Sequence, residues 1–381
     1  MRRTLYETEH EAFRESFRRF LQVEFVPHLD EWDAAGIVAR EFYAAAGKSG
    51  FLAMDAPEEF GGGGVPDFRF NAVIMEEIMR TGAAGAGLGI TLHNDVCLPY
   101  FLEYCSEEQK ARWLPGIASG ELITAIAMTE PGAGSDLAGI ATTARRDGDV
   151  YVVNGAKTFI TNGINADLVI VAARTSDDPH AGLSLMVVER GMDGFERGKQ
   201  IEKLGQHCSD TSELFFEDVH VPAENLLGPE GSGFGQLVAR LVPERLILAV
   251  GALASAEAAF EITLDYVKER KAFGQPVGSF QHNKFKMAEL QTKLEVTQAY
   301  VDDCVIAHTK GELTAVDAAK AKWWSAQVQN DVLDECVQLY GGYGYMNEYR
   351  VARAWRDARV TKIWAGSNEI MKELIGRDLG L

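Results

Sequence analysis

The stretch that decides the fold is residues 241–275, LVPERLILAVGALASAEAAFEITLDYVKERKAFGQ. Every residue from 246 to 254 is apolar or glycine, so a helix formed here has no solvent face and must be buried on all sides. Apolar residues then recur at steps of three and four as far as Val267, which predicts a long helix packed against other helices. We expect the rest of the chain to be organised around this helix.

Glu244 is the carboxylate at the start of this apolar stretch, and the local sequence leaves two interpretations open. Burial would raise the pKa of the carboxyl group and make it a proton acceptor near neutral pH. Alternatively, Pro243 occupies the first helical position and Glu244 faces the positive end of the helix dipole. A decision between them has to come from elsewhere in the chain.

The composition indicates a globular, soluble protein of two or three domains. The chain has 381 residues, of which 46% are hydrophobic and 24% are charged. No apolar run reaches the roughly 18 residues that indicate a membrane span. The N-terminus lacks the apolar core of a signal peptide, so export is not expected.

The net charge and the spacing of the cysteines and histidines argue against binding to nucleic acid, anionic membranes or metal ions. With 37 basic against 56 acidic residues the net charge is −19, which makes nucleic acid and anionic membranes poor partners. The five cysteines form no CxxC pair and are expected to be reduced thiols in a cytoplasmic compartment. The eight histidines show no metal-binding spacing, so no metal site is predicted.

The periodicity of apolar residues divides the chain into three parts. Residues 1–123 have helical periodicity, and helical periodicity returns over residues 234–381. Residues 124–233 contain short strand-like runs, with Asp147-Gly148 and Asn154-Gly155 expected as two-residue hairpin turns. The predicted fold class is therefore α+β, with an N-terminal α-helical domain, a central antiparallel β domain and a C-terminal α-helical domain.

Three further segments have the composition of binding loops: residues 127–136 (AMTEPGAGSD), 338–345 (QLYGGYGY) and 363–370 (IWAGSNEI). Proline and glycine in the first leave backbone N–H groups free to meet a ligand. Each segment also has a purely structural interpretation. The first can be an ordinary connecting loop, and the second can be a helix C-cap. In the third, Ser367 or Asn368 can be a helix N-cap.

Together with KTFITNG and RKAFGQ, these segments resemble those of the acyl-CoA dehydrogenase family, in the expected order and across essentially the whole chain. PERL and SNEIMKELI are most similar to the long-chain branch of that family. The resemblance implies a C-terminal four-helix bundle, with FAD between the β domain and the bundle and a fatty acyl-CoA thioester beside the flavin. It also implies removal of the α-proton by a glutamate and transfer of the β-hydride to flavin N5, giving the trans-2-enoyl-CoA.

The position of the glutamate base follows from a departure from the family pattern. Many members carry this glutamate at the position that Ala365 fills here, and alanine cannot accept a proton. The long-chain and isovaleryl branches place the base on a bundle helix, in a segment similar to residues 243–246. The resemblance therefore implies that Glu244 is the catalytic base.

The resemblance also implies the remaining site residues. FAD would be contacted from the β domain by Ile126, Ala127, Met128, Thr129, Phe159, Ile160 and Thr161. The FAD of a neighbouring subunit would be held by Arg270, Phe273, Gln281, Gln338, Gly341 and Gly342, and Ser367 and Glu369 would complete the dinucleotide site. The substrate would be contacted by Ser135, Arg245, Ala365 and Gly366.

A cofactor site shared between subunits implies an oligomer, and the family form is a homotetramer. The implied role is in fatty-acid β-oxidation or related acyl-CoA catabolism, with an electron-transferring flavoprotein as electron acceptor. Two other hypotheses stay open. A catalytically silent flavoprotein subunit is possible if Glu244 points away from the site, and a DNA-associated homologue would require a basic surface that the sequence lacks.

Overall fold

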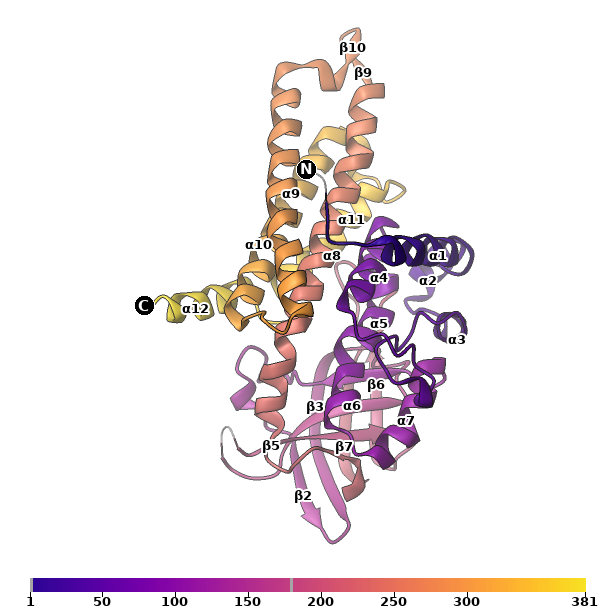
Figure 1. The fold of residues 1–381 in the computed structure, drawn as a ribbon, viewed down its shortest axis with the longest axis vertical. Helices are drawn as coiled ribbons and strands as arrows, with labels where there is room; N and C mark the ends of the chain where they lie inside the picture. The colour runs from indigo at the N-terminus through magenta and orange to yellow at the C-terminus, as the bar shows by residue number, and fades with distance from the viewer. Residues whose placement is uncertain (1–2, 179–180) are drawn as a thin grey trace.

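The computed structural model of the protein describes residues 3–178 and 181–381 (Figure 1). Helices make up the N-terminal part, a β sheet the middle part, and long helices the C-terminal part. Figure 1 shows the long helices at one end of the molecule, the sheet at the other, and the N-terminal helices along the side of both. The predicted α+β class and the order of its three parts are confirmed.

The N-terminal helices are short and pack around aromatic side chains. Phe17, Phe20 and Leu21 lie on one face of the first helix and are buried. Ser106 and Gln109 form the capping box that opens the last helix of this part. The elements are α1 (Thr8–Glu24), α2 (Leu29–Ala35), α3 (Arg40–Lys48), α4 (Phe68–Arg80), α5 (Ala84–Thr91), the π-helix η3 (Leu92–Cys97), α6 (Leu98–Tyr104) and α7 (Glu107–Ser119).

The central sheet runs in the order β6-β7-β3-β2-β4-β5-β8, with β1 beside β4. Most neighbours are antiparallel, while β4 pairs in parallel with β1 and, at one residue pair, with β2. The strands are β1 (Thr124–Ala127), β2 (Thr143–Asp147), β3 (Val150–Thr161), β4 (Leu168–Arg174), β5 (Leu183–Glu189), β6 (Phe195–Gln200), β7 (Thr211–Pro222) and β8 (Leu226–Leu227).

One of the two predicted hairpin turns is present, one residue later than expected at Gly148-Asp149, and the other is not. Asp147 pairs with Val150 across a tight turn in which Gly148 has a φ of 60°. Asn154 and Gly155 instead lie within the continuous strand β3, at a shift in its register with β7. Gly155 has a φ of 151°, and a Cβ there would lie 2.8 Å from the Cα of Thr142. The prediction of a turn at this pair was wrong because a β-bulge requires the same backbone freedom from glycine.

The C-terminal part is built on α8 (Gly233–Glu269), the longest helix among the described residues. Its apolar stretch packs against α4 of the N-terminal part and against α9 (Gln281–Thr309) and α10 (Ala315–Tyr340). The small strands β9 (Lys271–Ala272) and β10 (Gln275–Pro276) join α8 to α9, and α11 (Arg350–Ala358) and α12 (Asn368–Asp378) follow α10. The predicted organising role of residues 241–275 is therefore confirmed.

The start of α8 decides between the two interpretations of Glu244. The helix begins at Gly233, so Pro243 is inside it and Glu244 lies about three turns from its N-terminus. The interpretation of Glu244 as a first-turn residue facing the helix dipole was wrong, since the dipole effect is confined to the first turn. Pro243 still matters locally, because it removes one backbone N–H directly before Glu244.

By length and composition alone, α8 is also the one helix among the described residues that could cross a membrane. Its most apolar 18-residue window has a mean hydropathy of 1.6, and 78% of that window is buried inside the structure. A buried core helix has the same properties, so the apolar length of α8 is accounted for by packing within the chain. The absence of a membrane span stays a prediction.

Candidate active site

Glu244 is buried where α6 crosses α8. Only 4% of the residue is exposed, and Tyr100 Oη donates a hydrogen bond of 3.2 Å to its Oε1. Burial raises the pKa of Glu244 to about 8, although the Tyr100 hydrogen bond and the charges of Arg245 and Arg240 act to lower it. A carboxyl group with a pKa near neutral pH is well matched to accept a proton from a weak carbon acid.

A turn between α11 and α12 is bonded to Arg245, the residue that follows Glu244 on α8. Ala365 has a φ of 50° and Gly366 a φ of 88°, so two successive residues adopt the left-handed conformation. Arg245 Nε donates to the carbonyl of Ala365 over 3.4 Å, and Lys322 Nζ donates to the carbonyl of Gly366 over 2.6 Å. Side chains from α8 and α10 therefore hold both carbonyls of this turn.

Lys322 is one of the largest fully buried side chains among the described residues. Burial, followed by the nearby charge of Arg245, lowers the pKa of Lys322 to about 8. A buried amine is costly unless it is hydrogen-bonded, which explains why it binds the Gly366 carbonyl at short range. The turn and the lysine thus stabilise each other.

A buried ion pair organises the loop that follows β1. Lys157 Nζ lies 2.7 Å from Glu130 Oε1 and donates to the Met128 carbonyl over 3.1 Å. The Glu130 carboxylate also accepts the backbone N–H groups of Ala141 and Thr142. Burial alone would raise the pKa of Glu130, but the contact with Lys157 and the other hydrogen bonds hold it below its usual value. The start of the TEPGAGSD loop is therefore fixed, and within the loop Ala133 is buried while Pro131, Gly132, Gly134 and Ser135 are exposed.

The predicted flavin residues of the β domain converge on this loop. The Thr158 N–H donates to the Thr129 carbonyl over 2.9 Å, which joins β3 to the loop. Phe159 sits at a register shift of β3, has a φ of 59° and is 66% exposed. Its neighbours differ in exposure: Ile126, Ala127 and Ile160 are buried, and Met128, Thr129 and Thr161 are half-buried. An exposed aromatic ring beside accessible main chain fits a flat heteroaromatic ligand.

The other predicted flavin residues form a second group at the far end of α8 (Figure 1). Arg270 directly follows α8 and lies over the ring of Tyr343 at 5.6 Å. Phe273 has a φ of 52° and is 95% exposed. Gly341 and Gly342 have open space where a Cβ would stand, so their main chain can be approached. Gln281 and Gln338 are also exposed.

The structure does not bring these two groups together within one chain. The sheet lies beside the first half of α8, whereas Arg270 follows its last residue. A 37-residue helix is about 55 Å long, which is far longer than one dinucleotide.

The remaining predicted residues lie near the turn or on the loop. Ser367 caps α12 by accepting the Ile370 N–H at 3.3 Å, so the N-cap interpretation of this serine is confirmed. Glu369 is exposed in the first turn of that helix. Ser135 is exposed on the loop after β1, where it is free to meet a ligand.

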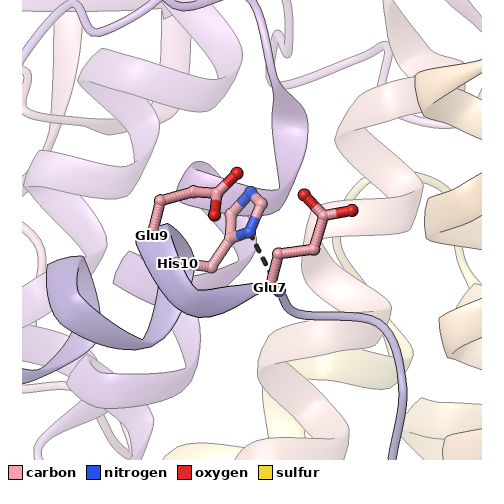
Figure 2. Close-up of side chains that lie close together, drawn as sticks. All are labelled: Glu7, Glu9 and His10. Carbon is pink, nitrogen blue, oxygen red and sulfur yellow. Dashed lines mark hydrogen bonds between the residues drawn. The ribbon is translucent and has the colours of Figure 1, made fainter.

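A possible metal cluster occurs elsewhere, at the start of α1. Ligand atoms of Glu7, Glu9 and His10 lie within 4.8 Å of one another (Figure 2). The His10 Nδ1 accepts the Glu7 backbone N–H, and its Nε2 lies 3.2 Å from Asp67. Both ring nitrogens are therefore engaged in helix capping and packing, which leaves two exposed carboxylates as an ordinary surface feature.

The sequence alone did not identify Tyr100 or Lys322. It also did not identify Lys157 as the partner of Glu130. The one available signal was for Lys157, which lies inside the KTFITNG motif; in the structure it is buried, as is Thr158 beside it. Tyr100 and Lys322 lie in unremarkable helical sequence. Their contacts with Glu244 and Gly366 depend entirely on how α6 and α10 pack.

Comparisons with known proteins agree with this geometry. Family models of the acyl-CoA dehydrogenase N-terminal, middle and C-terminal domains match residues 7–121, 125–219 and 231–380. The chain is 47% identical over 380 residues to the mitochondrial long-chain specific acyl-CoA dehydrogenase of Sus scrofa, covering 99% of this chain and 88% of that protein.

Solved structures give the same result. An acyl-CoA dehydrogenase from Geobacillus kaustophilus has a TM-score of 0.97 and 49% identity, and the match covers 99% of both chains. An acyl-CoA dehydrogenase from Bacillus anthracis, solved in complex with FAD, has a TM-score of 0.92 and 33% identity, with 98% of this chain and 68% of that chain covered.

Proposed function

This chain belongs to the acyl-CoA dehydrogenase family, and on that premise we propose which of its residues carry out the FAD-dependent dehydrogenation of an acyl-CoA thioester. Glu244 is the base that removes the α-proton. The observation that carries this assignment is a buried carboxyl group with a pKa of about 8, next in sequence to Arg245, which binds the carbonyl of Ala365. The side chains of Ala365 and Gly366 themselves cannot accept a proton.

The two predicted groups of residues fit FAD. The exposed ring of Phe159 and the main chain around Met128 and Thr129 suit the isoalloxazine, and Arg270 beside accessible glycine main chain suits the pyrophosphate. When bound, FAD accepts the hydride that leaves the β-carbon. Glu244 takes the α-proton, so the substrate loses one proton and one hydride and becomes the enoyl thioester.

The turn at Ala365 and Gly366 is proposed to bind the thioester oxygen. A carboxylate alone is too weak a base for this α-proton, so a donor must stabilise the negative charge that develops on that oxygen. The backbone N–H of Ala365 is the proposed donor. Arg245 and Lys322 hold the carbonyls of the same turn, so they would keep the donor in place before the substrate arrives.

We propose a homotetramer in which each flavin site includes residues of two subunits. The support is the separation of the two flavin groups along α8, which leaves each group incomplete within its own chain. Sedimentation of the purified protein tests this proposal. A monomer that retains FAD and full activity would contradict it.

The electron acceptor is proposed to be an electron-transferring flavoprotein, because the reduced flavin has to pass its electrons to a second redox protein. A cytoplasmic location is proposed because all five cysteines are free thiols, as is usual in reducing compartments. A long acyl chain is proposed from the likeness to the long-chain specific relative.

The test is anaerobic titration of the FAD-bound protein with straight-chain and branched acyl-CoAs of increasing length, following the bleaching of oxidised flavin. Wild type is expected to bleach, and Glu244→Gln is expected to bind FAD and ligand without bleaching. Equal bleaching by the variant would show that another group is the base. A wild type that binds FAD and is never reduced would favour the silent-subunit hypothesis.

A further inference from the structure

Tyr100 is the one described residue that donates a hydrogen bond to Glu244. It comes from α6, 144 residues away in the sequence, and its side chain is fully buried. The hydroxyl binds Oε1, and no described residue bonds to Oε2. One carboxylate oxygen is thus held in place while the other stays available to a proton.

The position of Tyr100 is fixed by the π-helix η3 that directly precedes α6. His93 on η3 lies 3.0 Å from the Ile117 carbonyl through Nε2 and 2.9 Å from Thr124 Oγ1 through Nδ1. Asn94 binds the main chain of Phe51 and Ala53. A π-helix is rare and occurs frequently at functional sites. Here its side chains anchor the start of α6 on both sides.

The charged and titratable groups around Glu244 leave Tyr100 as its direct partner. Arg245 is turned toward Ala365, and Arg240 forms a 2.8 Å ion pair with Glu103. Cys97 lies nearby on η3, and burial raises the pKa of its thiol, so it stays neutral. Burial also raises the pKa of Tyr100 well above its ordinary value, so its hydroxyl keeps its proton and acts as a donor.

We propose that Tyr100 is a positioning residue for Glu244: its hydroxyl fixes the carboxylate rotamer and favours the ionised form that accepts the α-proton. The inference rests on the proposed role of Glu244 as the base. The 3.2 Å bond is longer than a short charge-assisted one, so the expected effect is moderate. Removing the hydroxyl makes Glu244 harder to ionise, which moves proton transfer to higher pH.

The experiment isolates proton transfer from hydride transfer. A 3-thiaacyl-CoA has sulfur in place of the β-carbon, so it has exchangeable α-hydrogens and no hydride to lose. The FAD-bound protein is incubated with 3-thialauroyl-CoA in deuterated buffer at a series of pH values, and deuterium uptake at C2 is measured by mass spectrometry. Wild type, Tyr100→Phe, Tyr104→Phe and Glu244→Gln are compared.

Exchange by wild type is expected to rise with pH through a midpoint near 8. For Tyr100→Phe the midpoint should rise by about one pH unit, the size expected from one hydrogen bond to a charged group. Tyr104→Phe removes the same hydroxyl one helical turn away and should behave as wild type. If Tyr100→Phe and wild type give the same midpoint, the positioning role is wrong. If Glu244→Gln exchanges like wild type, the base assignment itself is wrong.

A second variant separates hydrogen bonding from packing. Incorporation of 3,5-difluorotyrosine at position 100 makes the phenol a stronger donor with little change in shape. The midpoint should then move below the wild-type value, opposite to the effect of Tyr100→Phe. A shift in the same direction for both variants would mean that altered packing is responsible, and would overturn the proposal.

Discussion

On the proposed assignment, Glu244 supplies the base from a helix, whereas Ala365 in the turn before α12 cannot accept a proton. The α-proton needs a carboxylate within reach, and either a helix or the neighbouring turn can supply it. In this chain the carboxylate comes from α8, and the turn keeps its left-handed backbone with only alanine and glycine. The proposed role of the turn therefore depends on its main chain and not on a side chain.

Glu244→Gln should lower kcat/KM for the best acyl-CoA by about 10²–10⁴-fold, the usual contribution of a positioned base. Steady-state kinetics with a dye acceptor measures this. Glu257→Gln is the matched control, because Glu257 lies on the same helix and burial also raises its pKa, to about 7, but it faces Arg3 and Arg80. A similar loss of activity in both variants would argue against a specific role for Glu244.

The same substitution should stabilise the protein at alkaline pH. The pKa of Glu244 is about 8 in the folded chain against an ordinary 4.5, so the folded state holds a proton that the unfolded state releases. Wild-type stability therefore falls as pH rises between these values, by at most about 1.4 kcal/mol per pH unit. Glutamine does not ionise, so the variant does not lose stability in this way as pH rises. Urea unfolding of both proteins from about pH 5 to about pH 8 should show a widening gap, and parallel curves would contradict this.

At the scale of elements, the two loops of the candidate site are held in place by buried side chains from neighbouring helices and strands. The turn before α12 is bonded by Arg245 from α8 and by Lys322 from α10. The loop after β1 is likewise held by Lys157 from β3 through Glu130. In both cases a buried cation binds backbone carbonyls of the segment.

Lys322→Met should weaken both the turn and the reaction. The Gly366 carbonyl would lose its partner, which costs about 1–3 kcal/mol for a buried acceptor. The loss should appear as a lower thermal midpoint and as a fall of about tenfold in kcat, with FAD still bound. Lys320→Met is the control, since Lys320 is on the same helix but is 44% exposed and pairs only with Asp317. Unchanged kcat in Lys322→Met would show that the hydrogen bond from Lys322 to the Gly366 carbonyl does not affect the reaction.

At the scale of the whole molecule, a buried ion network joins the N-terminal segment to the long helices. Glu76 on α4 lies 2.6 Å from Arg3 and 2.8 Å from Arg14, and Arg3 also lies 2.7 Å from Asp302 on α9. Burial alone would raise the pKa of Glu76, but the two arginines hold it below its usual value. The network therefore stays charged at neutral pH.

Glu76→Gln should destabilise the protein by about 3–5 kcal/mol, because it leaves two buried arginines without full compensation. The contribution of Glu76 is present above its ordinary pKa of 4.5 and is lost as pH falls through its lower folded value. The difference between wild type and variant in urea unfolding should therefore shrink in acid. Glu261→Gln, whose partner Arg80 lies at the surface, should cost less than about 1 kcal/mol.

The order of the three parts and the buried central helix could be predicted from the sequence. These features depend on patterns within one stretch, such as the unbroken apolar run at residues 246–254. Local sequence patterns predicted the conformation of single residues less reliably. Asn154-Gly155 suits a turn and a bulge equally, and Pro243 suits the first turn of a helix or its interior.

The sequence by itself determined that this chain is an α+β protein of its family, and alanine at position 365 led to the proposal that Glu244 is the base. Only the tertiary structure decided that Glu244 is buried inside α8, that Tyr100 bonds to it and that Lys322 holds the opposite turn. The physical reason is that burial and hydrogen bonds between distant segments are set by how helices pack. A pKa near 8 belongs to that packed environment, since the same glutamate in an open chain would ionise near 4.5.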